Sequence, residues 1–208
     1  MEFLVKKMRT SVILAVFLLA SVSAFSQTAI ISAFKKSYAL EKKGEFKKAA
    51  EEIKKVYDAK SYEINLRLGW LDYQAGLFTE SASYYQKAVD LMPYSEEAKF
   101  GLIYPKAALG KWSEVINLYN KILANNPNNT TANYRLGLIY YGQKNYTKAY
   151  KYFNKVVNLY PFGYDGLLML AWTNFQQGKL REAKVLFNKV LMYSPNDKSA
   201  LEGLSLIK

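Results

Sequence analysis

Four of the five prolines stand at a fixed interval of 34 residues, at Pro93, Pro127, Pro161 and Pro195. A constant period of this length indicates one supersecondary unit that has been copied along the chain, and each copy must stack on its neighbours to bury its apolar side chains. The spacing therefore predicts a solenoid rather than a globule. It also directs attention to the long surface of such a stack, because a catalytic site would need separate support.

Small and apolar residues recur at fixed distances before each proline. The position eight residues before it is always aromatic, at Tyr85, Tyr119, Phe153 and Phe187. Apolar residues at spacings of three and four form the stripe of an amphipathic helix. Glycine, which turns the chain most easily, separates two such stripes in most units, and Lys144 takes its place in one of them. Each unit is therefore expected to hold two helices, the second of which ends at the proline.

This register of Leu-Gly, mid-unit Gly, Ala, aromatic residue and Pro resembles the tetratricopeptide repeat, with Leu68-Gly69 and Leu136-Gly137 as clear instances. The resemblance implies an all-α fold, an α-α superhelix (solenoid) of about five helix-turn-helix repeats with a C-terminal capping helix. The repeat domain would span residues 27–208. Its repeats are expected at residues 30–63, 62–95, 96–129, 130–163 and 164–197, and the cap at 198–208.

Residues 1–26 are predicted to be a secretory signal peptide. Lys6, Lys7 and Arg9 precede an apolar run at residues 12–20, and small residues follow it. The run is shorter than the roughly 20 residues that span a membrane. We expect cleavage, with an uncleaved anchor as the alternative. The chain has no cysteine, which excludes disulfides and lipid attachment through a cysteine. We therefore expect an exported bacterial protein, periplasmic or secreted.

The formal net charge is +12, which favours polyanionic partners in general. Export argues against nucleic acid, so the lysines are expected either to face solvent or to make a peripheral contact with an anionic envelope surface. Catalysis has little support, because the chain has no histidine and no cysteine. No carboxylate cluster has metal-binding spacing and no glycine-rich phosphate loop is present. We expect no enzyme activity, no metal and no cofactor.

In this family the first helices of successive repeats line the concave face. The residues that the same phase places there are mostly aromatic, and we expect them to form a ligand-binding groove: Tyr38, Leu66, Trp70, Tyr73, Phe100, Tyr104, Tyr134, Tyr141, Trp172 and Phe175. Tyr and Trp are favoured as interface anchors. The competing interpretation is that these rings pack between adjacent first helices and stay covered.

The ligand of such a groove is only partly constrained. Some members of this family hold a C-terminal carboxylate with Lys, Asn and Arg, but aromatic and apolar residues occupy the corresponding positions here. Acidic residues lie near the expected edge, at Glu63, Glu97 and Asp165, so a basic or a neutral ligand would fit.

Two local features are expected in the middle of the array. Pro105 lies inside the first helix of the third repeat, where it removes a hydrogen bond to Gly101 and predicts a kink. Asp72 and Lys106 occupy equivalent positions of adjacent repeats, which suggests an ion pair between them.

Together these features predict a non-enzymatic scaffold in the bacterial cell envelope that binds a protein or peptide partner through an aromatic concave groove. Two alternatives stay open. One is a module for polysaccharide or another anionic polymer, with rings stacked on sugars and lysines on acidic groups. The other is a structural subunit of an envelope assembly or secretion complex.

Overall fold

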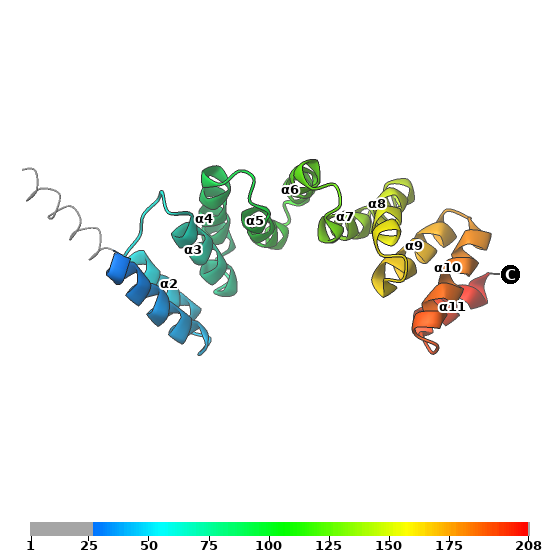
Figure 1. Cartoon of the computed structure of the whole chain (residues 1–208), viewed down its shortest axis with the longest axis horizontal. Coiled ribbons are helices and arrows are strands. Elements are labelled where there is room, and N and C mark those ends of the chain that lie inside the picture. The colour runs from blue at the N-terminus through cyan, green and yellow to red at the C-terminus, as the bar shows by residue number, and fades with distance from the viewer. Residues whose placement is uncertain (1–26, 208) are drawn as a thin grey trace, which may run out of the picture. The chain divides into compact units, whose positions relative to one another are not determined.

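The computed structural model describes residues 27–207, and within them it contains α-helices and no strand. The first helical segment covers residues 27–41. The helices that follow are α2 (Phe46–Lys54), α3 (Tyr62–Gln74), α4 (Phe78–Leu91), α5 (Glu96–Ala108), α6 (Trp112–Asn125), α7 (Thr130–Gly142), α8 (Tyr146–Leu159), α9 (Tyr164–Gln176), α10 (Leu180–Tyr193) and α11 (Lys198–Leu206) (Figure 1). The helices among these residues are too short or too polar to cross a membrane. The predicted signal peptide lies outside the described residues.

The first helix of most repeats begins at a side-chain cap two residues after the position of the repeat proline. The side-chain oxygens of Ser95, Asn129 and Asp197 accept hydrogen bonds from backbone N–H groups of α5, α7 and α11, and the distances are 3.1, 2.9 and 2.8 Å. Such a cap satisfies one of the free donors at a helix start. The helix boundaries therefore follow from two short signals, a proline that ends one helix and a capping residue that begins the next.

The turn between the two helices of a repeat requires a left-handed backbone. Gly178 has φ +73°, and Lys144 has φ +57° at the equivalent position of the preceding repeat. The expected mid-unit turn therefore forms with lysine as well, although a side chain costs roughly 1 kcal/mol in this conformation.

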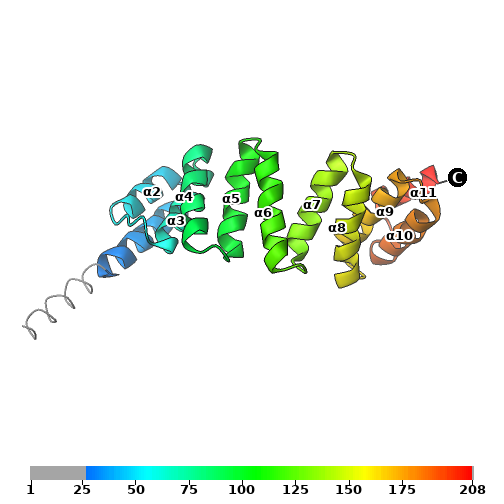
Figure 2. The same ribbon diagram turned by 90° about the horizontal axis from the view of Figure 1, so that it is seen from above.

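The chain separates into two compact units at Lys111 and Trp112. In the first unit, α3 packs against α2, α4 and α5; in the second, each helix from α6 to α11 packs against the next one along the chain (Figure 2). First helices also contact each other, α3 with α5 and α7 with α9. The core of the first unit includes Ile53, Ile64 and Leu68, and that of the second unit includes Phe153 and Phe187.

The aromatic residue of the second helix is the central packing element of each stack. Tyr85 on α4 is buried between two glycines, Gly69 on α3 and Gly101 on α5. A Cβ atom at Gly69 would lie 2.7 Å from the Tyr85 ring, and one at Gly101 would lie 2.1 Å from it. Phe153 meets Gly137 in the same way, and Phe187 meets Gly203. The rings therefore lie directly on the bare backbone of the first helices.

The same contact explains the glycine near Pro105. α5 extends through Pro105 without interruption, and the N–H of Leu109 donates to the Pro105 carbonyl at 3.0 Å. The helix therefore continues past Pro105, and the kink expected there stays a prediction. In the structure, Gly101 makes room for the Tyr85 ring.

Buried polar side chains hold the connections between repeats. Asn65 donates to the carbonyls of Ala59 and Ser61 at 3.1 and 2.7 Å, and Asn133 donates to those of Pro127 and Asn129 at 3.1 and 2.9 Å. Lys99 makes the corresponding contacts with the carbonyls of Pro93 and Ser95. These three residues are spaced 34 apart. The same side-chain position therefore donates hydrogen bonds to the backbone carbonyls of three successive turns between repeats.

Substitution of Gly101 by alanine tests the ring contact. In an exposed helix this change stabilises by up to about 1 kcal/mol. Here the new methyl group would overlap Tyr85, so we expect a net loss of about 1–3 kcal/mol in the free energy of unfolding, measured by urea denaturation. The control is Gly142→Ala at the end of α7, where no neighbouring atom lies within 4 Å of the new Cβ, and stability should rise. Equal stability of Gly101→Ala and the wild type would contradict the close packing.

The ion pair expected between Asp72 and Lys106 does not form. Asp72 is buried, with 1% of its surface exposed, and neither carboxylate oxygen has a hydrogen-bond partner. Burial raises the pKa of Asp72 above its ordinary value; the charge of Lys54 opposes this and that of Glu80 adds to it. Because Asp72 and Lys106 occupy equivalent positions, they lie on the first helices of adjacent repeats, α3 and α5. The repeat position does not determine the direction in which each side chain points.

Replacing Asp72 by asparagine should produce a pH-dependent gain in stability. Because folding raises the pKa of Asp72, the contribution of this group to stability is fully present below about pH 3.9 and is lost as pH rises through the folded pKa. At pH 7, Asp72→Asn should therefore be more stable than the wild type by about 1 kcal/mol and unfold at a higher temperature, whereas at pH 3 the two should unfold at the same temperature. Thermal melts followed by circular dichroism measure this. Exposed Asp90→Asn is the control, and the same gain for both variants at pH 7 would refute the assignment.

Candidate functional site

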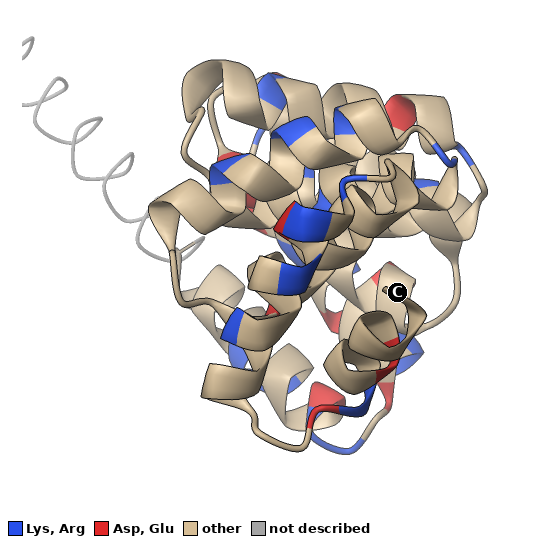
Figure 3. Ribbon diagram, turned by 90° about the vertical axis from the view of Figure 1, so that its right-hand side faces the viewer, with Lys and Arg blue, Asp and Glu red and all other residues tan. Residues whose placement is uncertain are grey.

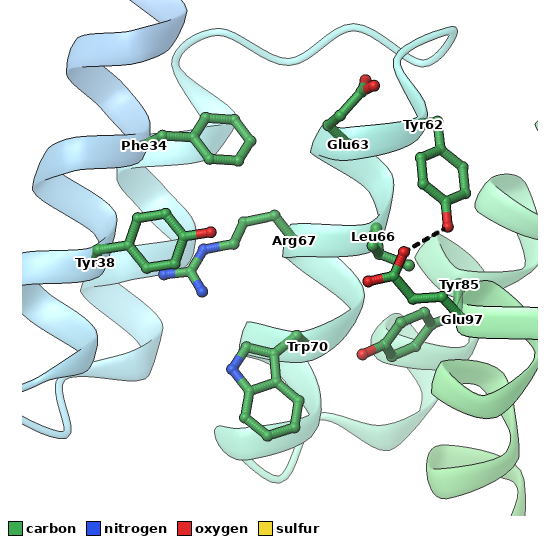
Figure 4. A pocket seen from close by; sticks show the side chains of 9 residues that line it. All are labelled: Phe34, Tyr38, Tyr62, Glu63, Leu66, Arg67, Trp70, Tyr85 and Glu97. Atoms are coloured by element: carbon green, nitrogen blue, oxygen red, sulfur yellow. Dashed lines mark hydrogen bonds between the residues drawn. The ribbon is translucent and has the colours of Figure 1, made fainter.

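A pocket of about 480 Å³ lies over α3 in the first unit, between the helical segment 27–41 and α5. Its lining is rich in rings and includes two carboxylates: Phe34, Tyr38, Tyr62, Glu63, Leu66, Arg67, Trp70, Tyr85 and Glu97. Figure 4 shows Phe34 and Tyr38 on one side, Glu97 and Tyr85 on the other, and Arg67, Leu66 and Trp70 projecting from α3. Tyr38 and Trp70 keep 49% and 37% of their surface exposed, so both rings are accessible.

A polar network joins the 27–41 segment to α3 along one wall. The Arg67 guanidinium, in a side chain that is 7% exposed, lies 2.6 Å from the Glu41 carboxylate and 3.9 Å from the centre of the Tyr38 ring. It also donates to Ser37 Oγ at 3.0 and 3.3 Å. Glu41 accepts a further hydrogen bond from Trp70 Nε1 at 2.6 Å. The network therefore fixes the orientation of both Arg67 and Trp70.

The pKa of Glu41 reflects this network. Burial alone would raise it, but the hydrogen bonds from Trp70 and Arg67 and the positive charge of Arg67 outweigh burial, so the pKa is lowered from its usual value. Glu41 is therefore ionised at neutral pH and compensates the charge of Arg67.

The opposite wall has a different electrostatic character. The Tyr62 hydroxyl lies 2.9 Å from Ser95 Oγ and donates to the Glu97 carboxylate at 3.1 Å. Burial raises the pKa of Tyr62, and the charges of Glu97 and Glu63 add to the rise. Burial also raises the pKa of Tyr85, again with a contribution from Glu97. Both hydroxyls are therefore neutral at physiological pH.

Three of the predicted groove residues, Tyr38, Leu66 and Trp70, come together in this pocket. Tyr73 lies beside it, in a ring cluster 6.5 Å from Trp70 and 5.6 Å from Tyr104. Tyr104 is 52% exposed. Phe100 is half-buried on α5. Of the predicted residues in the first unit, Tyr38, Trp70 and Tyr104 are therefore exposed, whereas Leu66, Tyr73 and Phe100 are half-buried.

In the second unit the predicted groove residues are half-buried and pack on other rings. Tyr134 lies 5.7 Å from Phe153, and Tyr141 lies 5.4 Å from Tyr146. Trp172 contacts Phe175 and Phe187 at 5.6 and 5.1 Å and donates to Ser199 Oγ at 2.9 Å. The arrangement of these four residues agrees better with the packing interpretation than with an open groove.

Sequence reasoning missed Arg67, Glu41 and Ser37, although these residues fix the pocket wall. One signal was present: Arg67 interrupts an apolar stretch at a position that holds Gly101, Arg135 and Met169 in the following repeats. A charged side chain at a packing position needs a buried partner. The 34-residue period did not point to Glu41 as the partner of Arg67, because the first repeat does not keep the spacing of the other repeats.

The chemistry of the pocket suits binding. Its only buried charge is paired, and residues 27–207 contain no group of three or more acidic side chains placed to hold a metal ion. What the pocket offers is ring surface, the apolar side chain of Leu66 and carboxylates at the rim.

Solved structures with the same fold are numerous. A tetratricopeptide repeat protein from Parabacteroides merdae ATCC 43184 aligns with a TM-score of 0.74 and 23% identity, over 86% of this chain and 72% of that one. MamA aligns with a TM-score of 0.68 and 25% identity, over 76% and 94%. YrrB, described as a tetratricopeptide repeat protein with an unusual peptide-binding site, aligns with a TM-score of 0.68 and 16% identity, over 85% and 92%. These similarities confirm the predicted all-α helical-repeat fold.

Sequence comparison agrees with the fold. No curated protein matches the chain. Models of the tetratricopeptide repeat match residues 34–96, 130–162 and 164–197, which together are more than half of the chain. The unmatched stretch between them contains Pro105. Register, fold and family models agree, and the chain belongs to the tetratricopeptide repeat family.

Proposed function

We propose that the chain is a non-enzymatic scaffold of the bacterial cell envelope that binds a protein or peptide partner, and that the pocket over α3 is the binding site. Proteins of this family are generally scaffolds for protein–protein interaction. The observation that carries the proposal is the pocket itself, where Tyr38 and Trp70 stay accessible beside Leu66.

The pocket has the properties of an anchor site for a side chain. A volume of about 480 Å³ holds one or two side chains of an extended partner. Tyr and Trp give large contact areas with few rotatable bonds. The hydrogen bond from Trp70 to Glu41 holds the indole in place before binding, which reduces the entropy lost on association. The peptide-binding site in the description of YrrB is consistent with such a role for this fold.

A scaffold role also fits the chemistry that the chain has available. It has no histidine and no cysteine, and the buried Arg67 of the pocket is engaged by Glu41 and Ser37. A nucleophile with an adjacent base would be needed for covalent catalysis, and no such pair lines the pocket.

The envelope location rests on the sequence of residues 1–26. Its order of basic, apolar and small residues is that of a secretory signal peptide. The location is therefore proposed independently of the pocket.

Substitution of Trp70 by alanine tests the binding site. Peptides would be selected from a phage-displayed library of random dodecapeptides on the full chain, and their affinities measured by fluorescence anisotropy. Loss of a central aromatic anchor costs about 2 kcal/mol or more, so we expect Trp70→Ala to weaken binding by about 30-fold. The control is Trp112→Ala, because Trp112 is also exposed but lies outside the pocket.

Circular dichroism checks that both variants keep the helix content of the wild type. Selected peptides that bind Trp70→Ala and the wild type with equal affinity would show that the pocket is not the site.

One observation favours the alternative of an anionic-polymer module. A second pocket of about 470 Å³ lies on α6 and α8, and its lining contains Lys151, Lys155, Tyr152, Asn154 and Asn158 but no carboxylate. Lysines match acidic groups, and Asn side chains donate to and accept from hydroxyl groups.

Polygalacturonate is a suitable probe for this alternative. If it holds, the polymer binds the full chain at low salt, binding weakens steeply as NaCl is raised, and the double variant Lys151→Gln/Lys155→Gln loses about tenfold in affinity. The matched control, Lys42→Gln/Lys43→Gln, removes the same charge from exposed positions elsewhere. Equal effects of the two double variants would indicate non-specific attraction to a basic protein.

A further inference from the structure

We infer that the pocket over α3 takes a basic side chain, Lys or Arg, of the partner, with its apolar stem on the rings and its charged end at Glu97. The inference rests on the proposed function, since it assumes that the pocket binds a partner, and it adds the chemistry of the group that enters.

The one cation in the pocket does not repel such a ligand. Arg67 lies 2.6 Å from Glu41, stacks on the Tyr38 ring and donates to Ser37. Its charge is compensated and its donors are directed toward the 27–41 segment. Arg67 is therefore not available to bind a carboxylate of the partner either.

The charges that remain in the pocket are negative. Glu63 and Glu97 line it and are exposed. Within residues 27–207, neither carboxylate has a Lys or Arg nitrogen in ion-pair distance. The negative charge of Glu97 also acts on neighbouring groups of this wall, since it contributes to the raised pKa of both Tyr62 and Tyr85. The field on this wall therefore favours a cation.

Glu97 is positioned to receive that cation. Its carboxylate accepts a hydrogen bond from the Tyr62 hydroxyl, and Figure 4 shows it between α3 and α5, facing the space above Leu66 and beside Tyr85. Glu63 points toward the outer rim in the same view. Both residues also lie in the first turn of a helix, where a carboxylate is favoured by the helix dipole. The dipole accounts for acidic residues there but not for the contact that turns Glu97 toward the pocket.

The ring surface suits the rest of a basic side chain. Lysine and arginine bury their methylene stems against apolar groups while the charged end stays in contact with water or a counter-ion. Trp70, Leu66 and Tyr85 provide such groups in the same pocket as Glu97. An aromatic face also attracts a cation directly.

The pocket differs in sign from the chain as a whole. The formal net charge is +12, and Figure 3 shows Lys and Arg spread over many helices, with fewer Asp and Glu. The net charge therefore disfavours a basic partner, whereas the carboxylates of the pocket attract one. Such complementarity confers specificity and favours productive encounters.

The test uses the peptides selected on the full chain and compares Glu97→Gln with Glu96→Gln. The two variants lose the same charge from the same turn of α5, but only Glu97 lines the pocket. We expect the selected peptides to be enriched in Lys or Arg, and Glu97→Gln to weaken their binding by about tenfold, the equivalent of roughly 1.4 kcal/mol. Glu96→Gln should change the affinity by less than about twofold.

A change in the peptide provides a second measurement that leaves the protein intact. Citrulline in place of arginine, or norleucine in place of lysine, should weaken binding to the wild type but not add to the loss in Glu97→Gln. Peptides that depend on Trp70 but contain no basic residue, or that bind Glu97→Gln as tightly as the wild type, would overturn the inference and leave the proposed function standing. Failure of every peptide to depend on Trp70 would instead remove the proposed function.

Discussion

The stacking of both units depends on the contact between an aromatic ring and a bare helix backbone. Tyr85 lies on Gly69 and Gly101, Phe153 on Gly137 and Phe187 on Gly203, with no room for a Cβ atom at any of these glycines. Apolar rings bury the largest area per residue, so each contact contributes much of the stability that a single helix pair cannot supply. The glycines therefore allow the rings of the second helices to approach the backbone of the first helices closely.

Much of the fold could be predicted from the sequence, because a 34-residue period reports local requirements that repeat. The proline and the capping residue determine where helices end and begin, and a left-handed turn is needed even where Lys144 replaces glycine. The side-chain contacts between helices were harder to predict. Asp72 and Lys106 are equivalent by position but do not pair, and Asn65, Lys99 and Asn133 recur at the same period without an apolar pattern to draw attention to them.

The candidate site could be predicted only in part, since the phase of a helix gives the face of a residue but not its contacts. Tyr38, Leu66 and Trp70 were placed on the same surface and do line one pocket. The equivalent residues of the second unit, such as Trp172, pack against neighbouring rings. Side chains outside the predicted columns also shape the pocket. Arg67 pairs with Glu41, and Glu41 accepts a hydrogen bond from Trp70, so contacts that the helical phase does not give fix the orientation of the indole.

The attachment of the 27–41 segment to α3 has a thermodynamic consequence. This segment supplies Phe34 and Tyr38 as one side of the pocket, and Glu41 as the acceptor for both Arg67 and Trp70. If the segment undocked, the pocket would lose this side, and the Trp70 indole would at the same time lose its hydrogen bond to Glu41. Any molecule that binds there must therefore favour the docked state, and by linkage the docked state must favour the molecule. Binding in the pocket and docking of the first helix are therefore thermodynamically coupled, and a change in one shifts the other.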